Sequence, residues 1–328
     1  MSTVRDRDLR LWLLDRRDRL KTATGRFKDN AQITHLLKEV DSALERIDNG
    51  SYGLCEVCHE PIEEEALITD PLIRVCLDHL TPAQQQSLEQ DLSQAAKIQA
   101  KLLPNKNVSI PGWDIYYHYE AAGPVSGDYC DLVELGTDNE DLLFVLGDVS
   151  GKGVAASMLM ANLHAIFHSL VSVGLSITEM MERANRLFCE STMSTDYATL
   201  VCGKIGQSGE IEICNAGHFP PLLVRKGEIS YLGPTGLPLG MFCSGEYTLN
   251  KLWLSAGDSL LLYTDGLTEA RNKLDSEYGE KRLVELVKGF PEPSAQMLTE
   301  ACLKDLRNFL SGAPKTDDLT IMAIRRTM

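Results

Sequence analysis

The 328-residue chain has no uninterrupted apolar run of roughly 18 residues, the length that a helix needs to span a bilayer. Its first residues mix both charge signs and lack the apolar stretch of a signal peptide. Internal repeats and low-complexity tracts are absent. Basic residues are scarce, because 32 Lys and Arg face 47 Asp and Glu. These absences predict a cytoplasmic protein without a membrane segment, and they argue against direct binding to nucleic acid phosphates.

The acidic residues are spread unevenly along the chain. Residues 1–50 carry 11 Lys and Arg against 9 Asp and Glu, so the excess negative charge lies in residues 51–328. Such a concentration of acid is expected in a protein that holds cations, although solubility alone would also explain it. At roughly 100 to 200 residues per domain, the length predicts two domains.

The first 50 residues contain two helical patterns of apolar side chains, within 5–48. The first pattern breaks near Gly25, and Asn49-Gly50 stops the second. We therefore expect residues 1–50 to form a helical hairpin.

A further helix is predicted over residues 81–104, because Thr81 suits a cap and Pro104 would end the helix. Its apolar residues form one stripe: Leu88, Leu92, Ala95, Ile98 and Leu102. This stripe fits packing on the helix's own domain, and it also fits pairing with a second copy in a homodimer. We expect residues 81–106 to form a linker helix that could transmit a signal.

From residue 107 to 328 the pattern changes to short strands with glycine-rich turns. The expected strands are 113–120, 141–149, 197–205, 210–217, 221–226, 259–266 and 319–324. The expected helices are 153–170, 177–190, about 280–289 and 294–310. Because the strands cluster as hairpin-like pairs, the fold class predicted is α+β with mostly antiparallel sheets.

Between the two helical regions lies a cysteine-containing module, residues 51–80. Cys55 and Cys58 are followed after 17 residues by Cys76, and His79 completes a C-x2-C-x17-C-x2-H pattern. Two pairs of ligands at this spacing suit one tetrahedral Zn²⁺ with no open position, which is a structural site. His59 is an alternative fourth ligand. The pattern predicts one structural zinc ion per chain, which would supply much of the folding energy of this module.

Residues 43–80 resemble the DksA/TraR-type zinc finger. That family usually has four cysteine ligands, and here His79 stands where the last cysteine would be. The family members that bind RNA polymerase insert a long coiled coil. The helices within 5–48 look too short for that reach, so polymerase binding is not expected.

Four acidic segments stand at strand ends among glycines and other turn residues: Gly127-Asp128-Tyr-Cys-Asp131, Gly147-Asp148-Val-Ser-Gly, Tyr263-Thr-Asp265-Gly266 and Thr316-Asp317-Asp318. A strand that ends in this way places a carboxylate at the sheet edge, with backbone free to approach a ligand. Oxygen ligands of this kind suit Mg²⁺ or Mn²⁺. One such segment is typical of a simple turn, but four of them in an acidic domain indicate a metal site.

In order and context, residues 90–326 resemble the PPM-type metal-dependent serine/threonine phosphatases, in particular their bacterial SpoIIE/RsbU-like branch. The motifs that carry the resemblance are IQAKLLP, GPVSGDYCD, GDVSGKGVAASMLMA, ATLVCGKI, NAGHFPPLLV, GLPLG, LLYTDGLTEARN and TDDLTIMAIR. The resemblance implies an antiparallel β-sandwich flanked by helices, with two metal ions at one end.

The resemblance also implies which residues act. Asp128, Asp148, Asp265 and Asp317 would bind two Mn²⁺ or Mg²⁺ ions, with the Val149 carbonyl completing one coordination shell, and Asp318 is not separable from Asp317 by sequence. Two such ions activate a water for attack on phosphorus. No catalytic Cys or Ser is expected, and the chain has no Cys-x5-Arg pattern of a cysteine phosphatase.

The glycine loop departs from the eukaryotic branch of the family. Where those enzymes carry Asp-Gly-His-Gly-Gly, this chain has Asp148-Val-Ser-Gly-Lys152. The histidine that could protonate the leaving group is therefore missing, and a water would have to supply the proton. Lys152 either positions a phosphate or is a solvated loop residue.

Three other features leave alternatives open. His218, in Asn215-Ala-Gly-His218, either shapes the mouth of a pocket or satisfies a turn. His164 and His168 lie one helical turn apart, which suits a metal, but no third ligand is visible, and packing explains them as well. Residues 236–240 read as a loop held by leucines or as a mobile gate.

The sequence is therefore compatible with two functions. The first is a phosphatase for phosphoserine and phosphothreonine, whose substrate by resemblance is a phosphorylated STAS-type anti-anti-sigma protein and whose zinc region is the regulatory input. The second is a non-enzymatic adaptor that contacts the transcription machinery through its zinc domain. The intact aspartates favour the phosphatase.

Overall fold

The computed structural model describes residues 2–24, 31–105, 110–135, 141–290 and 293–328. The predicted break at Gly25 and the predicted boundary between 106 and 107 lie outside the described residues. The chain divides into two compact units, Met1–Gln90 and Asp91–Met328.

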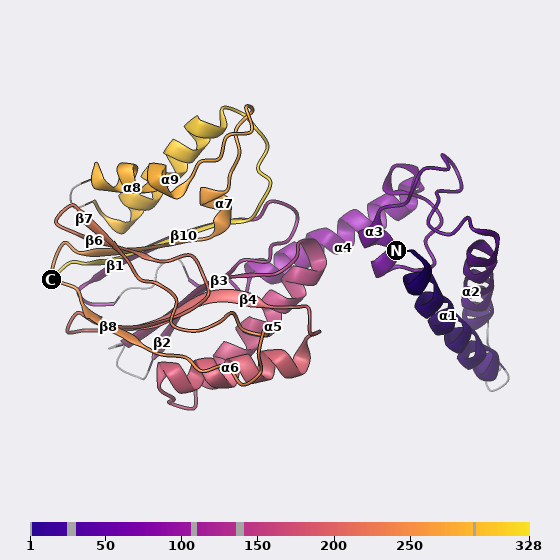
Figure 1. Ribbon diagram of the computed structural model, residues 1–328, viewed down its shortest axis with the longest axis horizontal. Coiled ribbons are helices and arrows are strands. Elements are labelled where there is room, and N and C mark those ends of the chain that lie inside the picture. Colours follow the sequence, from indigo (N-terminus) through magenta and orange to yellow (C-terminus); the bar gives the residue numbers. More distant parts are fainter. Residues whose placement is uncertain (1, 25–30, 106–109, 136–140, 291–292) are drawn as a thin grey trace. The chain divides into compact units, whose positions relative to one another are not determined.

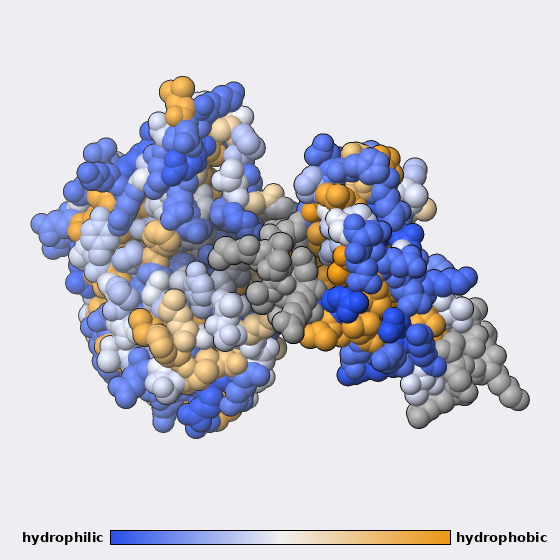
Figure 2. Space-filling model, turned by 45° about the vertical axis from the view of Figure 1, so that its right-hand side comes forward, coloured by the Kyte–Doolittle hydropathy of each residue, from blue (hydrophilic) through white to orange (hydrophobic). Residues whose placement is uncertain are grey.

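The first unit begins with the predicted helical hairpin. Helix α1 spans Ser2–Thr24 and α2 spans Ala31–Asn49. Leu13 of α1 and Val40, Ala43 and Leu44 of α2 are buried together, which explains the helical spacing of apolar residues in both segments. Figure 2 shows that hydrophobic surface also remains exposed on this unit, where Leu11 and Trp12 of α1 are 59% and 44% exposed.

The cysteine module of this unit has little regular structure. It contains α3, Glu64–Thr69, and a 3-10 turn, Leu77–His79. Its small core is formed around Cys55, Ile62 and Cys76. Arg46 of α2 donates hydrogen bonds to the carbonyl oxygens of Ile73, at 2.8 Å, and Leu72, at 3.1 Å, and so ties the module to the hairpin.

Helix α4 spans Pro82–Ala100, slightly shorter than predicted. The predicted apolar stripe is only partly covered within the described chain. Leu88 and Ile98 are exposed, whereas Leu102 packs against the core of the second unit. The buried residue of the helix is Gln99, which the apolar pattern did not anticipate.

The second unit contains two five-stranded antiparallel sheets. The first has the order β1-β10-β9-β6-β7, with bounds Trp113–Glu120, Leu319–Arg326, Ser259–Tyr263, Leu222–Arg225 and Glu228–Tyr231. The second has the order β2-β3-β4-β5-β8, with bounds Tyr129–Leu135, Asp141–Val149, Ala198–Gly206, Glu210–Ala216 and Asn250–Trp253. The predicted α+β sandwich is thereby confirmed.

Helices cover both outer faces of the sandwich (Figure 1). The second sheet is covered by α5, Gly153–Val171, and α6, Ile177–Ser191. The first is covered by α8, Glu280–Lys288, and α9, Ala295–Leu310, with the short α7, Asp265–Thr268, at its edge. The order of layers in this unit is therefore helix, sheet, sheet, helix.

The central strands have unbroken apolar sequences because their side chains alternate between two buried faces of the sheet. In β3, Leu142, Phe144 and Leu146 point between the sheets, while Leu143 and Val145 point toward α5 and α6. Because both faces of the strand are covered, every position favours an apolar residue.

Helix α5 is, among the described helices, the one long and apolar enough to cross a membrane. The sequence has no uninterrupted apolar run here because Asn162, His164 and His168 interrupt it. Met160 and Phe167 are fully buried against the second sheet, which is the environment of a core helix.

Cys189 of α6 and Cys243 form a disulfide with their Cα atoms 5.7 Å apart. Polar contacts of the Asn185 side chain bring the two segments together, since it accepts from the Gly240 amide at 2.9 Å and donates to the Phe242 carbonyl at 2.8 Å. The loop over 236–240 is thus fixed to α6, which argues against a mobile gate.

Candidate active site

One end of the sandwich collects polar side chains from both sheets. Asp128 precedes β2 and Asp148 lies near the end of β3, and both continue the alternation that points residues between the sheets. Thr264, directly after β9, and Thr320, in β10, hold the corresponding positions on the opposite sheet. The apolar core between the sheets therefore ends in a layer of hydroxyl and carboxyl groups.

Asp128 lies at the centre of this layer and is 1% exposed. Its Oδ2 accepts hydrogen bonds from Thr264 Oγ1 at 3.0 Å and from Thr320 Oγ1 at 2.5 Å. Its Oδ1 is buried with no hydrogen-bond partner among the described residues. Burial, and then the charges of Asp148 and Asp318, raise the pKa of Asp128 well above its ordinary value. A buried carboxylate oxygen without a donor is where a cation would be stabilised.

Asp265 and Asp317 join this end because β9 and β10 are antiparallel neighbours. Asp265 follows the end of β9, and Asp317 precedes the start of β10. The two turns approach so closely that a Cβ at position 266 would lie 1.8 Å from the Asp318 carbonyl oxygen. Only glycine fits at Gly266, so the Asp-Gly pair seen in the sequence has a packing cause.

The carboxylates raise one another's pKa values. Burial, followed by the charges of Asp265 and Asp317, raises the pKa of Asp148 to about 7. Burial, followed by Asp317, raises the pKa of Asp265 to about 6. The aspartates predicted from distant parts of the sequence thus form one mutually repelling group.

Asp318 differs from Asp317 in what its oxygens contact. Its Oδ1 accepts from the Ala122 amide at 2.7 Å, and its Oδ2 accepts from the Gly127 amide at 2.8 Å. Both oxygens are therefore used to hold the loop that carries Asp128. The structure in this way distinguishes two neighbours that the sequence could not separate.

Lys152, which the sequence left as either a phosphate-positioning or a solvated loop residue, contacts Asp317. Its Nζ lies 2.7 Å from Asp317 Oδ2 and 3.1 Å from the Thr316 carbonyl oxygen. The hydrogen bond to Asp317 raises the pKa of Lys152. An ammonium group therefore stands beside the carboxylates as a built-in positive charge.

Gly127 marks a narrow space beside Asp148. A Cβ on this glycine would lie 3.2 Å from the Val149 carbonyl oxygen and 3.6 Å from Asp148 Oδ1. The two groups that the resemblance assigns to one ion thus border the same small volume. The absence of a side chain at 127 keeps that volume open.

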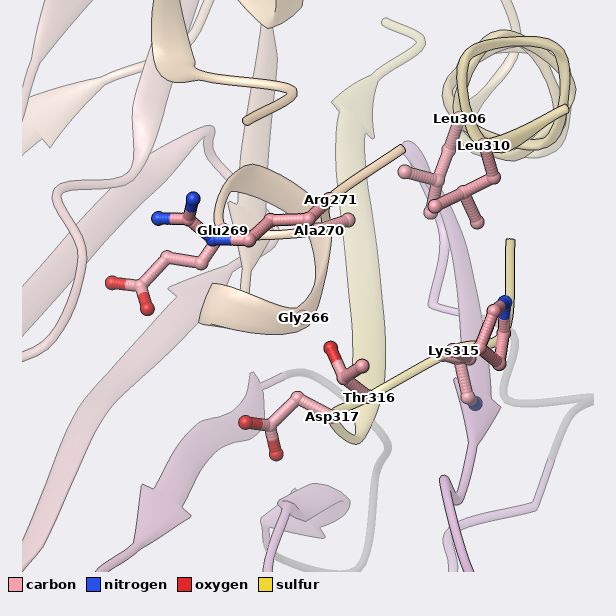
Figure 3. A pocket seen from close by; sticks show the side chains of 10 residues that line it. Gly266, Glu269, Ala270, Arg271, Leu306, Leu310, Lys315, Thr316 and Asp317 are labelled. Atoms are coloured by element: carbon pink, nitrogen blue, oxygen red, sulfur yellow. The ribbon is translucent and has the colours of Figure 1, made fainter. Parts of the chain in front are cut away.

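A cavity of about 180 Å³ lies beside Asp317 (Figure 3). Leu306 and Leu310 of α9 line one side, and the Asp317 carboxylate points away from them. Arg271 and Lys315 add positive charge to the lining. This depression offers a place for part of a substrate next to the carboxylates.

The raised pKa values predict a pH dependence of stability in metal-free protein. The pKa of Asp148 is near 7 in the folded chain, against 3.8 as its ordinary value, so the folded state binds the proton more tightly than the unfolded state. The stability that protonation provides is therefore lost as pH rises from about 4 to 7. At pH 8, Asp148→Asn should raise the melting temperature of chelator-treated protein by roughly 5 °C, as about 2 kcal/mol would in a domain of this size.

The measurement is thermal unfolding of both proteins in chelator at pH 5 and pH 8. The gain from Asp148→Asn should shrink at pH 5, where the native aspartate is largely protonated. A gain that is equal at both pH values, or no gain at pH 8, would contradict the raised pKa of Asp148.

The cysteine module brings its four predicted ligands together. The ligand atoms of Cys55, Cys58, Cys76 and His79 all lie within 4.8 Å of one another. Cys76 Sγ is 3.1 Å from His79 Nδ1 and 3.9 Å from Cys58 Sγ. His59 is not in the group, and its backbone takes a left-handed φ of 62° in the turn after Cys58.

The environment of these sulfur atoms favours a cation. Burial opposes ionisation of Cys55, but backbone amides of Cys58, Cys76 and Val57 outweigh it and lower the pKa of Cys55 to about 6. Burial and the neighbouring thiols of Cys55 and Cys58 raise the pKa of Cys76 to about 11. Crowded thiols of this kind suit Zn²⁺, which binds thiolates and imidazole.

His218 is explained by its turn. It is 4% exposed, and its Nδ1 lies 2.9 Å from Thr199 Oγ1. Its amide donates to Asn215 Oδ1 at 2.8 Å. Burial lowers the pKa of His218 to about 4, so the ring is neutral. These contacts favour the structural interpretation over a residue at the mouth of a pocket.

Known proteins and protein families share sequence similarity with this chain. The family model for Stage II sporulation protein E (SpoIIE) matches residues 138–327. Protein IcfG of Synechocystis sp. is 29% identical over 72% of this chain and 41% of its own length. Phosphoserine phosphatase RsbU of Bacillus subtilis is 25% identical over 74% of this chain and 72% of its own length.

Solved structures agree on the fold. The RsbU and RsbW domains of a Mycobacterium tuberculosis protein are 32% identical, cover 66% of this chain and 61% of that chain, and give a TM-score of 0.57. The SiaA-PP2C domain of Pseudomonas aeruginosa is 18% identical, covers 75% of this chain and 99% of that chain, and gives a TM-score of 0.66. Since the family model spans more than half of the residues, the chain belongs to the SpoIIE family and carries its PP2C-like, PPM-type serine/threonine phosphatase domain.

Proposed function

We propose that this chain is a metal-dependent phosphatase that hydrolyses phosphoserine and phosphothreonine in proteins. The observation that carries the proposal is the group of aspartates at the end of the sandwich, with one buried oxygen of Asp128 left without a donor. Bound Mn²⁺ or Mg²⁺ ions supply an activated water and neutralise the charge of the phosphoryl oxygens. Hydrolysis of a phosphoserine peptide that requires added Mn²⁺ is the direct assay.

The residues that would hold two ions are Asp128, Asp148, Asp265 and Asp317, together with the Val149 carbonyl oxygen. Their oxygen donors, and the raised pKa values of Asp128, Asp148 and Asp265, fit hard divalent cations. Asp318 has a different task in this proposal. Because both of its oxygens accept from backbone amides, it fixes the 122–127 loop and so positions Asp128.

Other residues of the chain prepare the site. The hydroxyls of Thr264 and Thr320 fix Asp128 Oδ2 and leave its Oδ1 facing the site. Gly127 keeps the space beside Asp148 open for a phosphoryl group and its water. The ammonium group of Lys152 holds Asp317 in place. No side chain is required as a nucleophile, so the thiols of the chain take no part.

The proposed substrate is a phosphorylated STAS-type anti-anti-sigma protein. Support comes from membership of the SpoIIE family, and the similarity to phosphoserine phosphatase RsbU, of which this chain covers 72%, supports a phosphoserine-containing substrate. An Asp148→Asn protein should retain phosphorylated partners and can be used as a trap. Recovery of a phosphorylated STAS-domain protein would support this substrate, and recovery of unrelated phosphoproteins would argue against it.

We further propose that the cysteine module holds one structural Zn²⁺ and serves as the regulatory input. The proximity of its three sulfur atoms and one ring nitrogen supports a closed tetrahedral site. Exposed Val57 and Ile68, at 59% and 64%, offer apolar surface for a partner. The adaptor alternative would use the same surface, but it gives no reason for the group of aspartates.

A contact of α4 supports regulation through the linker. Gln99 donates from Nε2 to the Ser126 carbonyl at 2.7 Å and accepts at Oε1 from the Ser126 amide at 2.9 Å. Ser126 immediately precedes Gly127 and Asp128. Any movement of this end of α4 would therefore displace the loop that carries a proposed metal ligand.

We expect Gln99→Ala to weaken Mn²⁺ binding and lower kcat by about tenfold. The substitution leaves two buried backbone groups of Ser126 without partners and frees the loop, and small misplacements of this kind are costly. Calorimetric Mn²⁺ titration and peptide hydrolysis provide the measurements. Gln94→Ala, at an exposed position of the same helix, is the control and should behave like the wild type. Equal behaviour of both variants would refute coupling through Gln99.

A further inference from the structure

A second group of ligand atoms lies on the other side of the second sheet, under α5. It consists of Asp131 from β2 and His164 and His168 from α5, and its ligand atoms all lie within 4.8 Å of one another. The two histidines are one helical turn apart, and their rings stack with centroids 4.0 Å apart. The sequence showed this pair, but the third member comes from a strand more than thirty residues away and was not visible.

Asp131 is held as a ligand would be held. It is 2% exposed, its Oδ1 accepts from the Leu132 amide at 2.9 Å, and its Oδ2 accepts from the Tyr129 hydroxyl at 2.9 Å. His168 Nε2 lies 2.8 Å from the same Oδ2. Hydrogen bonds from neighbouring groups that orient a ligand are a regular feature of metal sites.

The donor set indicates which kind of ion fits. Two imidazoles and one carboxylate suit Zn²⁺ and similar late transition metals, whereas Mg²⁺ prefers oxygen ligands alone. Two ligands of a tetrahedral zinc ion lie roughly 3.3 Å apart, so His168 would have to move by about half an ångström from Asp131. The side chain of His168 is 43% exposed, which allows both that movement and the entry of an ion.

We propose that Asp131, His164 and His168 bind one Zn²⁺-class ion per chain, separate from the aspartate site and from the cysteine module. Three protein ligands leave a fourth position for water. In the described structure the His168 ring donates its Nε2 proton to Asp131 Oδ2. Neutral imidazole binds a metal through its unprotonated nitrogen, so an ion that takes the place of this proton requires the proton to move to Nδ1 of the same ring. Because Asp131 follows Asp128 by three residues and α5 follows the Asp148 loop, the ion would brace two elements that lead to the active site.

The test is a Ni²⁺ titration of the full chain by calorimetry, with its zinc retained and excess Mg²⁺ present to occupy the carboxylates. The wild type should bind one Ni²⁺ tightly, and His164→Gln and His168→Gln should each weaken that binding by at least about 100-fold. His118→Gln is the matched control, because His118 also contacts a carboxylate, Glu120 at 3.0 Å, but has no second histidine in the group. It should bind as the wild type does.

Two further measurements keep the proposal open to refutation. Asp131→Asn keeps the hydrogen-bonding shape of the carboxylate, and its fold is checked by its melting curve. If it binds Ni²⁺ as tightly as the wild type, the site is only a pair of surface histidines and the three-ligand assignment is wrong. The Co²⁺-loaded protein should gain a weak visible band without the intense thiolate absorption of the cysteine module. An ion count equal in the wild type and in His168→Gln would overturn the proposal, whatever the outcome of the phosphatase assays.

Discussion

Replacing Asp148 with Asn should lower kcat for Mn²⁺-dependent hydrolysis of a phosphoserine peptide by about 10³-fold or more. The substitution removes one negative charge from the group of carboxylates and neutralises a residue that would hold a metal ion. Because the neutral amide would relieve the repulsion that helps to raise the pKa of Asp128, the variant should remain folded. Steady-state kinetics with a saturating peptide measure the effect.

The matched control lies at the other end of the same strand. Asp141 begins β3 and pairs with Lys204 at 2.6 Å near the surface, so Asp141→Asn removes the same charge far from the site. It should leave kcat within about twofold of the wild type, as surface ion pairs contribute little. If Asp148→Asn retained similar activity to Asp141→Asn, the assignment of the active site would be wrong.

Replacing His79 with Ala should release the zinc and unfold the cysteine module. The small core around Cys55, Ile62 and Cys76 cannot support the module alone, and structural zinc contributes on the order of 10 kcal/mol to such folds. We expect zinc content to fall from one per chain to near zero, and residues 51–80 to become readily cleaved by protease. Metal analysis and limited proteolysis with mass spectrometry measure both effects.

His59 provides the control for this experiment. It is the alternative fourth ligand by sequence, but it lies outside the group of four and takes a left-handed backbone conformation. His59→Asn preserves that conformation, since Asn tolerates it. This variant should keep its zinc and its resistance to protease. If His59→Asn lost its zinc and His79→Ala kept it, His59 and not His79 would be the fourth ligand. If the wild type bound no zinc, the proposed zinc site would be wrong.

Much of the fold followed from periodicity. The long central strands were predictable because each is apolar on two faces, as in β3 and β10. Strands β2, β7 and β8 were not expected. Strand β2 contains Asp131 and Glu134 and looks polar, and β7 and β8 are edge strands of four residues with exposed side chains. Their pairing is decided by neighbours in the sheet and not by their own sequence.

Those residues of the candidate site that lie in recognisable turn sequences could be predicted. Asp148 and Asp265 stand out because an apolar strand ends in an aspartate beside a glycine. Their partners could not be found in that way. Thr320 contacts Asp128 over a separation of 192 residues, and Gln99 contacts Ser126 over 27. Nothing in the immediate sequence of Thr320 or Gln99 distinguishes them from ordinary strand and helix residues.

The roles of two residues of the same type that lie close together in the sequence could be assigned only from the structure. Asp317 and Asp318 are equivalent in sequence, but Asp318 accepts from two amides of the 122–127 loop, whereas Asp317 contacts Lys152. His164 and His168 likewise gained a third partner only when β2 was placed against α5. Roles that depend on which groups lie opposite in space are not contained in local spacing.

The most direct measurement is an anomalous-scattering map of crystals grown with Mn²⁺. Two manganese peaks about 3.5–4 Å apart should lie among Asp128, Asp148, Asp265 and Asp317, with Asp318 still bound to the loop amides. Manganese found elsewhere on the molecule, or no manganese between the ends of the two sheets, would contradict the proposed phosphatase site.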